Sequence, residues 1–347
     1  MKKLLKSLII SLIIIIIMSG VSGAAHKNTS SKIVMDIDSG RVLYEENSDE
    51  KRPIASLTKI LTCITAIENL HLDSTVVIED KWTNIEGSSI YLKENECLTV
   101  EELLYGLMLR SGNDAATAIC GFAEKQGLDF ISLMIKTAGK AGAGNSSFEN
   151  PHGLDSKNHF STAKDLALIS SYALKSDVFR KIVATRSKKI GSGESERTLI
   201  NKNKLLTLYP YANGLKTGYT KKSGRCLASS ATKNGMNLVC IVLNEQSTYE
   251  TTEKLFEKCF NDYKNVVIQS SEEPVAYFRK AGKSLPCYTN GDVIYPLKAD
   301  EQNRITKKVK ITYDGGFPVS SDTEMGLIEF YLKNQLLFTQ KIYNIMS

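Results

Sequence analysis

A serine, Ser56, stands directly before the stretch of this chain with the clearest helical periodicity. Apolar residues recur there at steps of three and four, namely Leu57, Ile60, Leu61, Ile64 and Ile67. This spacing predicts a helix over residues 57–70 that is buried along one face. Ser56 would lie at its N-terminus, where unpaired backbone N–H groups and the helix dipole stabilise an anion. The fold is therefore expected to contain a buried helix with the Ser56 hydroxyl at its N-terminus.

Lys59 follows Ser56 by three residues, so its amine can approach the serine oxygen from the same helix face. The two residues are a candidate nucleophile and a candidate base. The alternative is an N-terminal capping serine followed by a solvated lysine. A second S-x-x-K match, Ser161 to Lys164, means that this spacing alone does not identify a catalytic pair.

The first residues of the chain have the three parts of a secretory signal. Lysines precede an apolar run at residues 8–18, and small residues follow at 19–25. The run is short for a membrane span, which favours cleavage near Ala24. We therefore expect a signal peptide over residues 1–25 and a secreted mature protein. No amphipathic segment precedes the chain end, so we expect no firm membrane anchor after cleavage.

Charge and ligand patterns argue against two classes of function. Without the three lysines of the signal, 41 basic residues stand against 38 acidic ones, with no dense basic block, so nucleic acid is not an expected partner. The seven cysteines contain no C-x-x-C pair, and the four histidines form no H-E-x-x-H pattern. We therefore expect no metal and no other cofactor. The cysteines are expected to be buried thiols.

The pattern up to residue 264 predicts helices packed on an antiparallel sheet that both ends of the domain sequence build. Alternating runs at residues 32–37 and 41–45 flank a hairpin signal. Runs at 226–230 and 238–243 flank another, Lys233-Asn234-Gly235. Helical periodicity also marks residues 103–110, 128–138, 162–174, 178–184 and 251–263.

The local signals around residue 110 predict how two of the helices begin. Thr99 and Glu102 form a capping box at the start of one helix. That helix leads into a turn at residues 111–113. Asp114 is then expected to cap the following helix, which is rich in alanine.

Beyond residue 264 the chain changes to short alternating runs, which predict a small all-β domain. These runs lie at residues 266–269, 274–278, 293–296, 309–313, 327–332 and 336–343. The expected fold class is α/β (α+β). The expected parts are the signal peptide at 1–25, a catalytic domain at 26–264 and a β-rich C-terminal domain at 265–347.

Three short signatures occur in one order along the chain: Ser56-x-x-Lys59, Ser111-x-Asn113 and Lys216-Thr217-Gly218. Each is weak alone, since Ser156-x-Asn158 also matches the second form. Together they place a serine at a helix start, a second on a turn between helices and a lysine at a strand edge. This ordered set is typical of class A β-lactamases and penicillin-binding proteins.

Longer stretches around the signatures, at residues 54–60, 111–116, 150–155 and 214–220, carry a family resemblance. Nearly the whole mature chain resembles the low-molecular-weight penicillin-binding proteins that are serine-type D-alanyl-D-alanine carboxypeptidases. The resemblance implies a β-lactamase/transpeptidase-like catalytic domain and a small second β domain. It also implies a wall-associated enzyme that trims peptidoglycan stem pentapeptides through an acyl-enzyme, with β-lactam antibiotics as covalent inhibitors.

The resemblance also implies a role for each matching position. Ser56 would be the acylated nucleophile, Lys59 its base, and Ser111 the group that passes the proton to the departing D-alanine. The implied substrate-binding positions are Asn113 for the peptide amide, Lys216 and Thr217 for the terminal carboxylate, Gly218 for close approach, and Tyr219 for an oxyanion hole with the Ser56 N–H. A lysine base needs burial or a neighbouring cation, and Lys216 is a candidate for that cation. His152 is expected to shape a turn.

One departure from the family pattern bears on function. Relatives often carry an arginine shortly after the strand that here ends near Asn244, and the stretch Gln246–Tyr249 has none. Lys202 is a candidate for the missing charge. The alternatives are therefore a slow or inactive penicillin-binding wall protein, or a β-lactamase. Against the β-lactamase stand the separate β domain and the lack of a Glu-x-x-Leu-Asn loop after Asn113.

Overall fold

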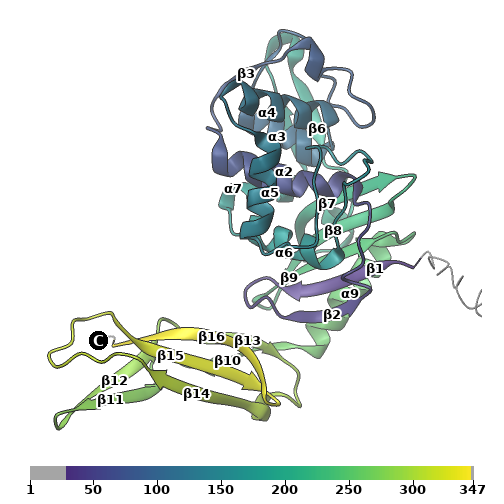
Figure 1. The fold of residues 1–347 in the computed structure, drawn as a ribbon. Coiled ribbons are helices and arrows are strands. Elements are labelled where there is room, and N and C mark those ends of the chain that lie inside the picture. Colours follow the sequence, from purple (N-terminus) through teal and green to yellow (C-terminus); the bar gives the residue numbers. More distant parts are fainter. Residues whose placement is uncertain (1–28, 345–347) are drawn as a thin grey trace, which may run out of the picture. The chain divides into compact units, whose positions relative to one another are not determined.

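The framework of the fold is a five-stranded antiparallel sheet in the order β2-β1-β9-β8-β7 (Figure 1). The computed structural model describes residues 29–344, so the expected signal peptide lies outside the described residues. The strands are β1 (Ser31–Asp36), β2 (Val42–Glu46), β7 (Ala212–Thr220), β8 (Gly224–Lys233) and β9 (Met236–Leu243). β1 pairs directly with β9, with Ile33 opposite Ile241. The predicted sheet from both ends of the domain sequence is confirmed.

Both faces of this sheet are buried, because alternate side chains of each strand enter different cores. On β1, Ile33 and Met35 belong to a large core with the helices, whereas Val34 belongs to a second core. Phe256 and Leu255 of α9 (Thr248–Asp262) complete that second core. The strands are therefore apolar on both sides, and α9 covers the face opposite the other helices (Figure 1).

The large core surrounds a central helix, α2 (Thr58–Asn69), of which every residue from Thr58 to Ala66 is buried. The other helices are α3 (Val100–Leu109), α4 (Asn113–Lys125), α5 (Phe130–Lys140), α6 (Ala163–Ala173), α7 (Asp177–Ala184) and the short α8 (Leu205–Leu208). The capping box of Thr99 and Glu102 is present at the start of α3. The periodicity predicted α2, α3, α5, α6 and α7 to within a few residues, but it did not predict α8. The prediction that α2 is buried along one face only is wrong, because α2 lies at the centre of the core and its residues from Thr58 to Ala66 are buried on all sides.

One predicted cap is wrong. Helix α4 begins at Asn113, and its N-cap residue is Gly112, so Asp114 is the second residue of the helix and not its cap. The Asp114 carboxylate binds the segment before α3 instead, where backbone N–H groups of Ile90 and Leu92 donate to it. A buried carboxylate needs several donors, and this segment supplies more of them than the helix end does.

The C-terminal strands form a separate sheet domain with its own apolar core (Figure 1). Its five-stranded sheet has the order β11-β12-β16-β15-β14, and β10 pairs with β13. The bounds are β10 (Lys264–Gln269), β11 (Ala276–Lys280), β12 (Lys283–Thr289), β13 (Val293–Leu297), β14 (Ile305–Ile311), β15 (Thr323–Leu332) and β16 (Gln335–Asn344). The sequence missed β12, because Pro286 within it argues against a strand. β14 begins earlier than predicted.

Smaller elements connect the main ones. Two hairpins pair β3 (Thr75–Val77) with β4 (Cys97–Thr99) and β5 (Ser187–Ile190) with β6 (Arg197–Ile200). Single 3₁₀ turns are η1 (Ala55–Leu57), η2 (Asp80–Trp82), η3 (Gly193–Ser195) and η4 (Gln302–Arg304). Six cysteines are buried as predicted, but Cys97 is exposed on β4, so that prediction is wrong for one thiol. Among residues 29–344, none of the helices combines the length and apolar character of a membrane span.

Candidate active site

Ser56 lies in the 3₁₀ turn η1, immediately before the central helix α2. The turn is held between α2 and strand β7. A Cβ atom added at Gly218 of β7 would lie 3.2 Å from the Ile54 carbonyl oxygen and 3.3 Å from the Ser56 nitrogen. Glycine therefore lets the strand approach the backbone of the serine, and any side chain there would press on it.

Lys59 is fully buried beside Ser56, and three oxygen atoms surround its amine. Its Nζ atom lies 3.1 Å from Ser56 Oγ, 2.7 Å from Asn113 Oδ1 and 2.5 Å from the His152 carbonyl oxygen. The two carbonyl oxygens can only accept, so they take both N–H bonds of a neutral amine. The remaining lone pair then faces the Ser56 hydroxyl. Burial, and next the charge of Lys216, holds the pKa of Lys59 well below its usual range.

Ser111 and Asn113 complete the polar surroundings of Ser56 from the turn between α3 and α4. Ser111 adopts a left-handed backbone conformation with φ of 65°, and its Oγ donates to Ser56 Oγ at 2.8 Å. Asn113 is 3% exposed, and its side-chain nitrogen donates to the Glu86 carbonyl at 2.5 Å. Because its oxygen accepts from Lys59, Asn113 links the central helix to the segment before α3.

Lys216 projects from β7 and is 1% exposed. Burial, and next the nearby charge of Lys202, lowers the pKa of Lys216 to about 7. Its Nζ donates to the Thr217 carbonyl at 3.0 Å. The site thus contains two buried lysines, and burial lowers the pKa of both.

A cavity of about 420 Å³ opens beside Ser56 and Asn113. Arg110 and Lys202 contribute to its lining, and Tyr219 stands at its edge with 65% of its surface exposed. None of the residues that line this cavity is acidic. The cavity is therefore suited to an anionic ligand whose carbonyl group reaches Ser56.

The wall of the cavity that contains Gly87, Ser88 and Ser89 is fixed by the buried Asp114. Ser89 Oγ donates to its carboxylate at 2.5 Å, and the Ile90 nitrogen donates at 3.1 Å. The Ser88 carbonyl in turn accepts a hydrogen bond from the backbone N–H of Asn113 at 2.7 Å. The wall and the start of α4 are consequently held together as one unit.

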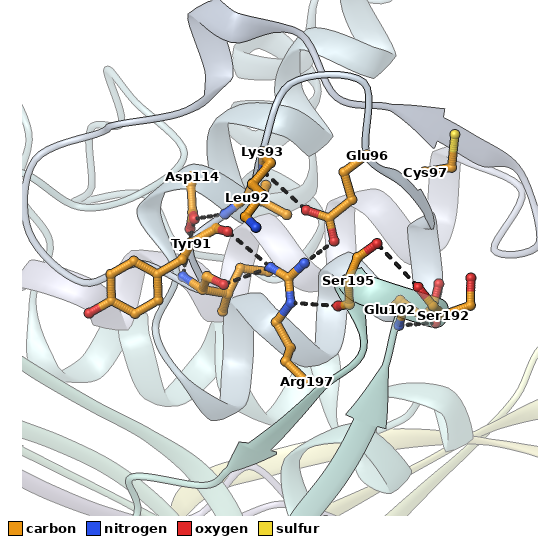
Figure 2. A network of polar contacts seen from close by, with 12 residues as sticks. Tyr91, Leu92, Lys93, Glu96, Cys97, Glu102, Asp114, Ser192, Ser195 and Arg197 are labelled. Carbon is orange, nitrogen blue, oxygen red and sulfur yellow. Dashed lines mark hydrogen bonds and ion pairs between the residues drawn. The ribbon is translucent and has the colours of Figure 1, made fainter.

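A second anchor holds the far end of the same wall, as Figure 2 shows. Arg197 of β6 forms an ion pair with Glu96, whose side chain is only 2% exposed. The same guanidinium donates to the carbonyls of Ile90 at 2.7 Å and Tyr91 at 3.2 Å. A planar guanidinium can bind a carboxylate and two carbonyls at once, so the Arg197 side chain alone holds residues 90–96 in place.

The other matches to the signatures lie in different surroundings. Ser161 is buried, with its Oγ 2.7 Å from Ser146 Oγ, and Lys164 is half-buried beside Asp49. Ser156 and Asn158 both donate to the Glu149 carboxylate. The second S-x-x-K match therefore pairs with the chain around Asp49 and Arg52, and the second S-x-N match is a local turn contact. Across residues 29–344, no group of three or more His, Cys, Asp or Glu side chains is arranged to hold a metal ion.

Two histidines lie near the site, and sequence reasoning gave a role to only one of them, His152. The carbonyl of His152 accepts from Lys59, in keeping with the expected turn. His159 is buried, and its Nε2 lies 2.8 Å from Thr58 Oγ1, between Ser56 and Lys59 on the chain. The two partners are 101 residues apart, so no spacing rule could have found this contact.

Comparison with known proteins gives one consistent result. The profile of a family described as D-alanyl-D-alanine carboxypeptidase matches residues 20–247. The chain is 30% identical over 349 residues to the D-alanyl-D-alanine carboxypeptidase DacF of Bacillus subtilis strain 168, covering 94% of this chain and 90% of that protein.

Solved structures agree with this match. The chain resembles the D-alanyl-D-alanine carboxypeptidase of Mycobacterium tuberculosis H37Rv with a TM-score of 0.63 and 32% identity, over 67% of this chain and 90% of the other. Its fold also resembles penicillin binding protein 5 of Haemophilus influenzae, with a TM-score of 0.75, 22% identity and coverage of 91% and 96%.

Proposed function

This chain belongs to the D-alanyl-D-alanine carboxypeptidase family, and on that premise we propose that it removes the terminal D-alanine of peptidoglycan stem pentapeptides through an ester on Ser56. One observation carries the proposal. The buried Lys59 Nζ lies against two carbonyl oxygens and the Ser56 hydroxyl, so a neutral amine there gives its N–H bonds to the carbonyls and leaves its lone pair to Ser56. Such a pair is an activated nucleophile with its base already in place.

In the first step, the Ser56 oxygen bonds to the carbonyl carbon of the penultimate D-alanine, and its proton moves to Lys59 Nζ. The carbonyl oxygen becomes an oxyanion, which accepts hydrogen bonds from the backbone N–H groups of Ser56 and Tyr219. Each such donor typically lowers the barrier by about 3 kcal/mol. The close approach of β7 at Gly218 supports this role, because it brings the strand next to the Ser56 amide.

In the second step, the bond between the carbonyl carbon and the nitrogen of the terminal D-alanine breaks. The proton that Lys59 took from Ser56 passes through the Ser111 hydroxyl to the departing nitrogen. This hydroxyl is 2.8 Å from Ser56 Oγ. Water then adds to the ester carbonyl, Ser56 regains its proton, and the shortened peptide leaves. Lys59 acts as the base for this water as it did for the serine.

Substrate binding is assigned to the cavity and to the neighbouring residues of strand β7, which lies against the Ser56 backbone. Lys216 and Thr217 bind the terminal carboxylate, and Asn113 holds the peptide amide. Lys202, which lines the cavity, contributes positive charge in place of the arginine that the stretch Gln246–Tyr249 lacks. β-Lactam antibiotics carry a carbonyl and a carboxylate in a similar relation, so they acylate the same serine.

We place this activity outside the cytoplasm, because peptidoglycan is the substrate and a signal peptide is expected over residues 1–25. The mature protein is then secreted and associated with the cell wall. Its proposed domains are the penicillin-binding serine peptidase domain at 26–264 and the β-rich domain at 265–347. Nucleic acid has no place among its partners, since the mature chain has no dense basic block.

The deciding experiment measures D-alanine released from a diacyl-D-Ala-D-Ala peptide by the mature protein, with and without prior exposure to penicillin. We expect steady release that penicillin abolishes. A protein that binds penicillin but releases no D-alanine would instead be a slow or inactive wall protein, which the missing arginine favours.

A further inference from the structure

The backbone next to the nucleophile is held in an uncommon conformation. Ala55, which precedes Ser56, has φ of 48°, in the left-handed region that non-glycine residues seldom adopt. Its carbonyl oxygen accepts a hydrogen bond from Thr58 Oγ1 at 2.9 Å. A conformation of this kind persists only where the surroundings fix it, so the contacts of that carbonyl matter for where the serine points.

His159 supplies the next contact, and its proton has only one possible place. The Glu149 backbone N–H donates to His159 Nδ1 at 3.1 Å, so Nδ1 carries no hydrogen. The hydrogen is then on Nε2, which lies 2.8 Å from Thr58 Oγ1 and donates to it. Thr58 passes its own hydroxyl hydrogen to Ala55. A one-way chain of hydrogen bonds thus runs from Glu149 through the imidazole to the carbonyl before Ser56.

The segment after His152 presses on the same carbonyl from another side. A Cβ atom at Gly153 would lie 2.0 Å from the Ala55 carbonyl oxygen and 2.8 Å from Thr58 Oγ1. Gly153 also has φ of 86°, which favours glycine. Since the neighbouring His152 carbonyl accepts from Lys59, this turn contacts the base and the strained peptide together.

The surroundings keep the imidazole uncharged at neutral pH. His159 is 5% exposed, and its ring meets that of Phe148 edge to face with centroids 5.7 Å apart. Burial is the main cause that lowers the pKa of His159 to about 4; the carboxylates of Glu149 and Asp155 oppose this shift, and the charge of Lys59 adds to it. The neutral tautomer that the chain requires is therefore the one present.

We propose that His159 is a positioning residue for acylation: through Thr58 it fixes the Ala55 carbonyl, and so the direction in which Ser56 attacks. The inference rests on the proposed function, because it concerns the same serine. His159 touches neither substrate nor reacting atoms. Its removal therefore lowers the rate of the chemical step and leaves substrate binding in place.

The test measures acylation by a fluorescent penicillin, and kcat and KM for D-alanine release, in full-length mature protein. His159→Phe removes both hydrogen bonds of the imidazole, whereas His159→Gln keeps an N–H donor for Thr58. We expect the first variant to lose tenfold or more in acylation rate and kcat with KM within twofold, and the second to stay within threefold of wild type. His71→Phe, at an exposed histidine, is the matched control and should change nothing.

A second pair of variants keeps the test decisive if His159→Phe does not fold, as judged by circular dichroism. Thr58→Val removes the hydroxyl at nearly constant shape, and Thr58→Ser retains it. Thr58→Val should reproduce the loss, and combining it with His159→Phe should add little, because both break one chain.

Some results would overturn this inference and leave the proposed function standing. One is a folded His159→Phe protein with unchanged kcat, and another is a Thr58→Val protein that acylates normally. A loss confined to KM would do the same, since it would mark a binding role. Wild-type protein that neither releases D-alanine nor forms a penicillin adduct would overturn the proposed function and this inference together.

Discussion

The Nζ atom of Lys59 lies 2.7 Å from Oδ1 of Asn113, and this contact joins the first two sequence signatures across the start of α4. Asn113 also donates to the Glu86 carbonyl, so its amide cannot rotate freely. The lysine is therefore aimed by a group that is itself fixed. This relation supports the proposed role of Lys59 as a base, because the amine is held in one position.

Replacement of Ser56 by alanine should abolish both D-alanine release and labelling by fluorescent penicillin, because the acyl-enzyme has no other nucleophile. Losses of up to about a million-fold are typical for such deletions. Ser161→Ala, which alters the other S-x-x-K match, is the control and should remain active. Adduct formation that persists in Ser56→Ala protein would refute the assignment of the nucleophile.

Lys59→Met should keep the fold and lose acylation, because methionine fills the space of the lysine stem but offers no lone pair. We expect the second-order rate constant for penicillin acylation to fall by at least about a thousand-fold, within the range typical of base removal. Lys164→Met, at the lysine of the second match, should match wild type. Comparable acylation rates in the two variants would place the base elsewhere.

The pH profile of kcat/KM should be bell-shaped. Lys59 must be neutral, so activity grows as pH rises through its lowered pKa. Lys216 must be charged to bind a carboxylate, and burial lowers its pKa to about 7, so activity falls as pH rises beyond that value in the free enzyme. Lys216→Arg keeps its charge and should shift the alkaline limb to higher pH. An unmoved limb would show that another group titrates there.

Arg197→Met should destabilise the protein by about 3 kcal/mol, because it leaves the buried Glu96 carboxylate without its partner. Urea denaturation followed by circular dichroism measures this change. Adding Glu96→Gln should recover part of the loss. As a comparison, Lys254→Met breaks an exposed pair with Glu250 and should cost less than about 1 kcal/mol. Equal losses in the two cases would mean that the Arg197 network does not fix the loop.

Much of the fold followed from local pattern. The short apolar runs of β1 and β9, each beside a hairpin turn signal, and the helical period of α2 were strong enough to predict the central sheet and helix. β12 was missed because it contains Pro286 and is largely polar, so its strand conformation depends on pairing with β11 and β16.

Part of the candidate site could also be predicted from local sequence patterns. Ser56 and Lys59 share one helical turn, so their contact is local. Asp114, Arg197 and His159 were not found, because each acts through partners more than twenty residues away along the chain. Such roles arise from tertiary packing, which a single sequence does not display.

Penicillin should remain on Ser56 far longer than the peptide acyl group. Both ligands acylate the serine, but the D-alanine leaves and admits water, whereas the opened β-lactam stays tethered and blocks that path. A β-lactamase overcomes this with a carboxylate that activates water. Glu149 does not fill that role, since its carboxylate accepts hydrogen bonds from Ser156 and Asn158, and the cavity lining contains no acidic residue. Intact-mass spectrometry should therefore detect a penicilloyl adduct for minutes or longer, while the peptide is turned over. Rapid regeneration of free protein with destruction of penicillin would favour a β-lactamase.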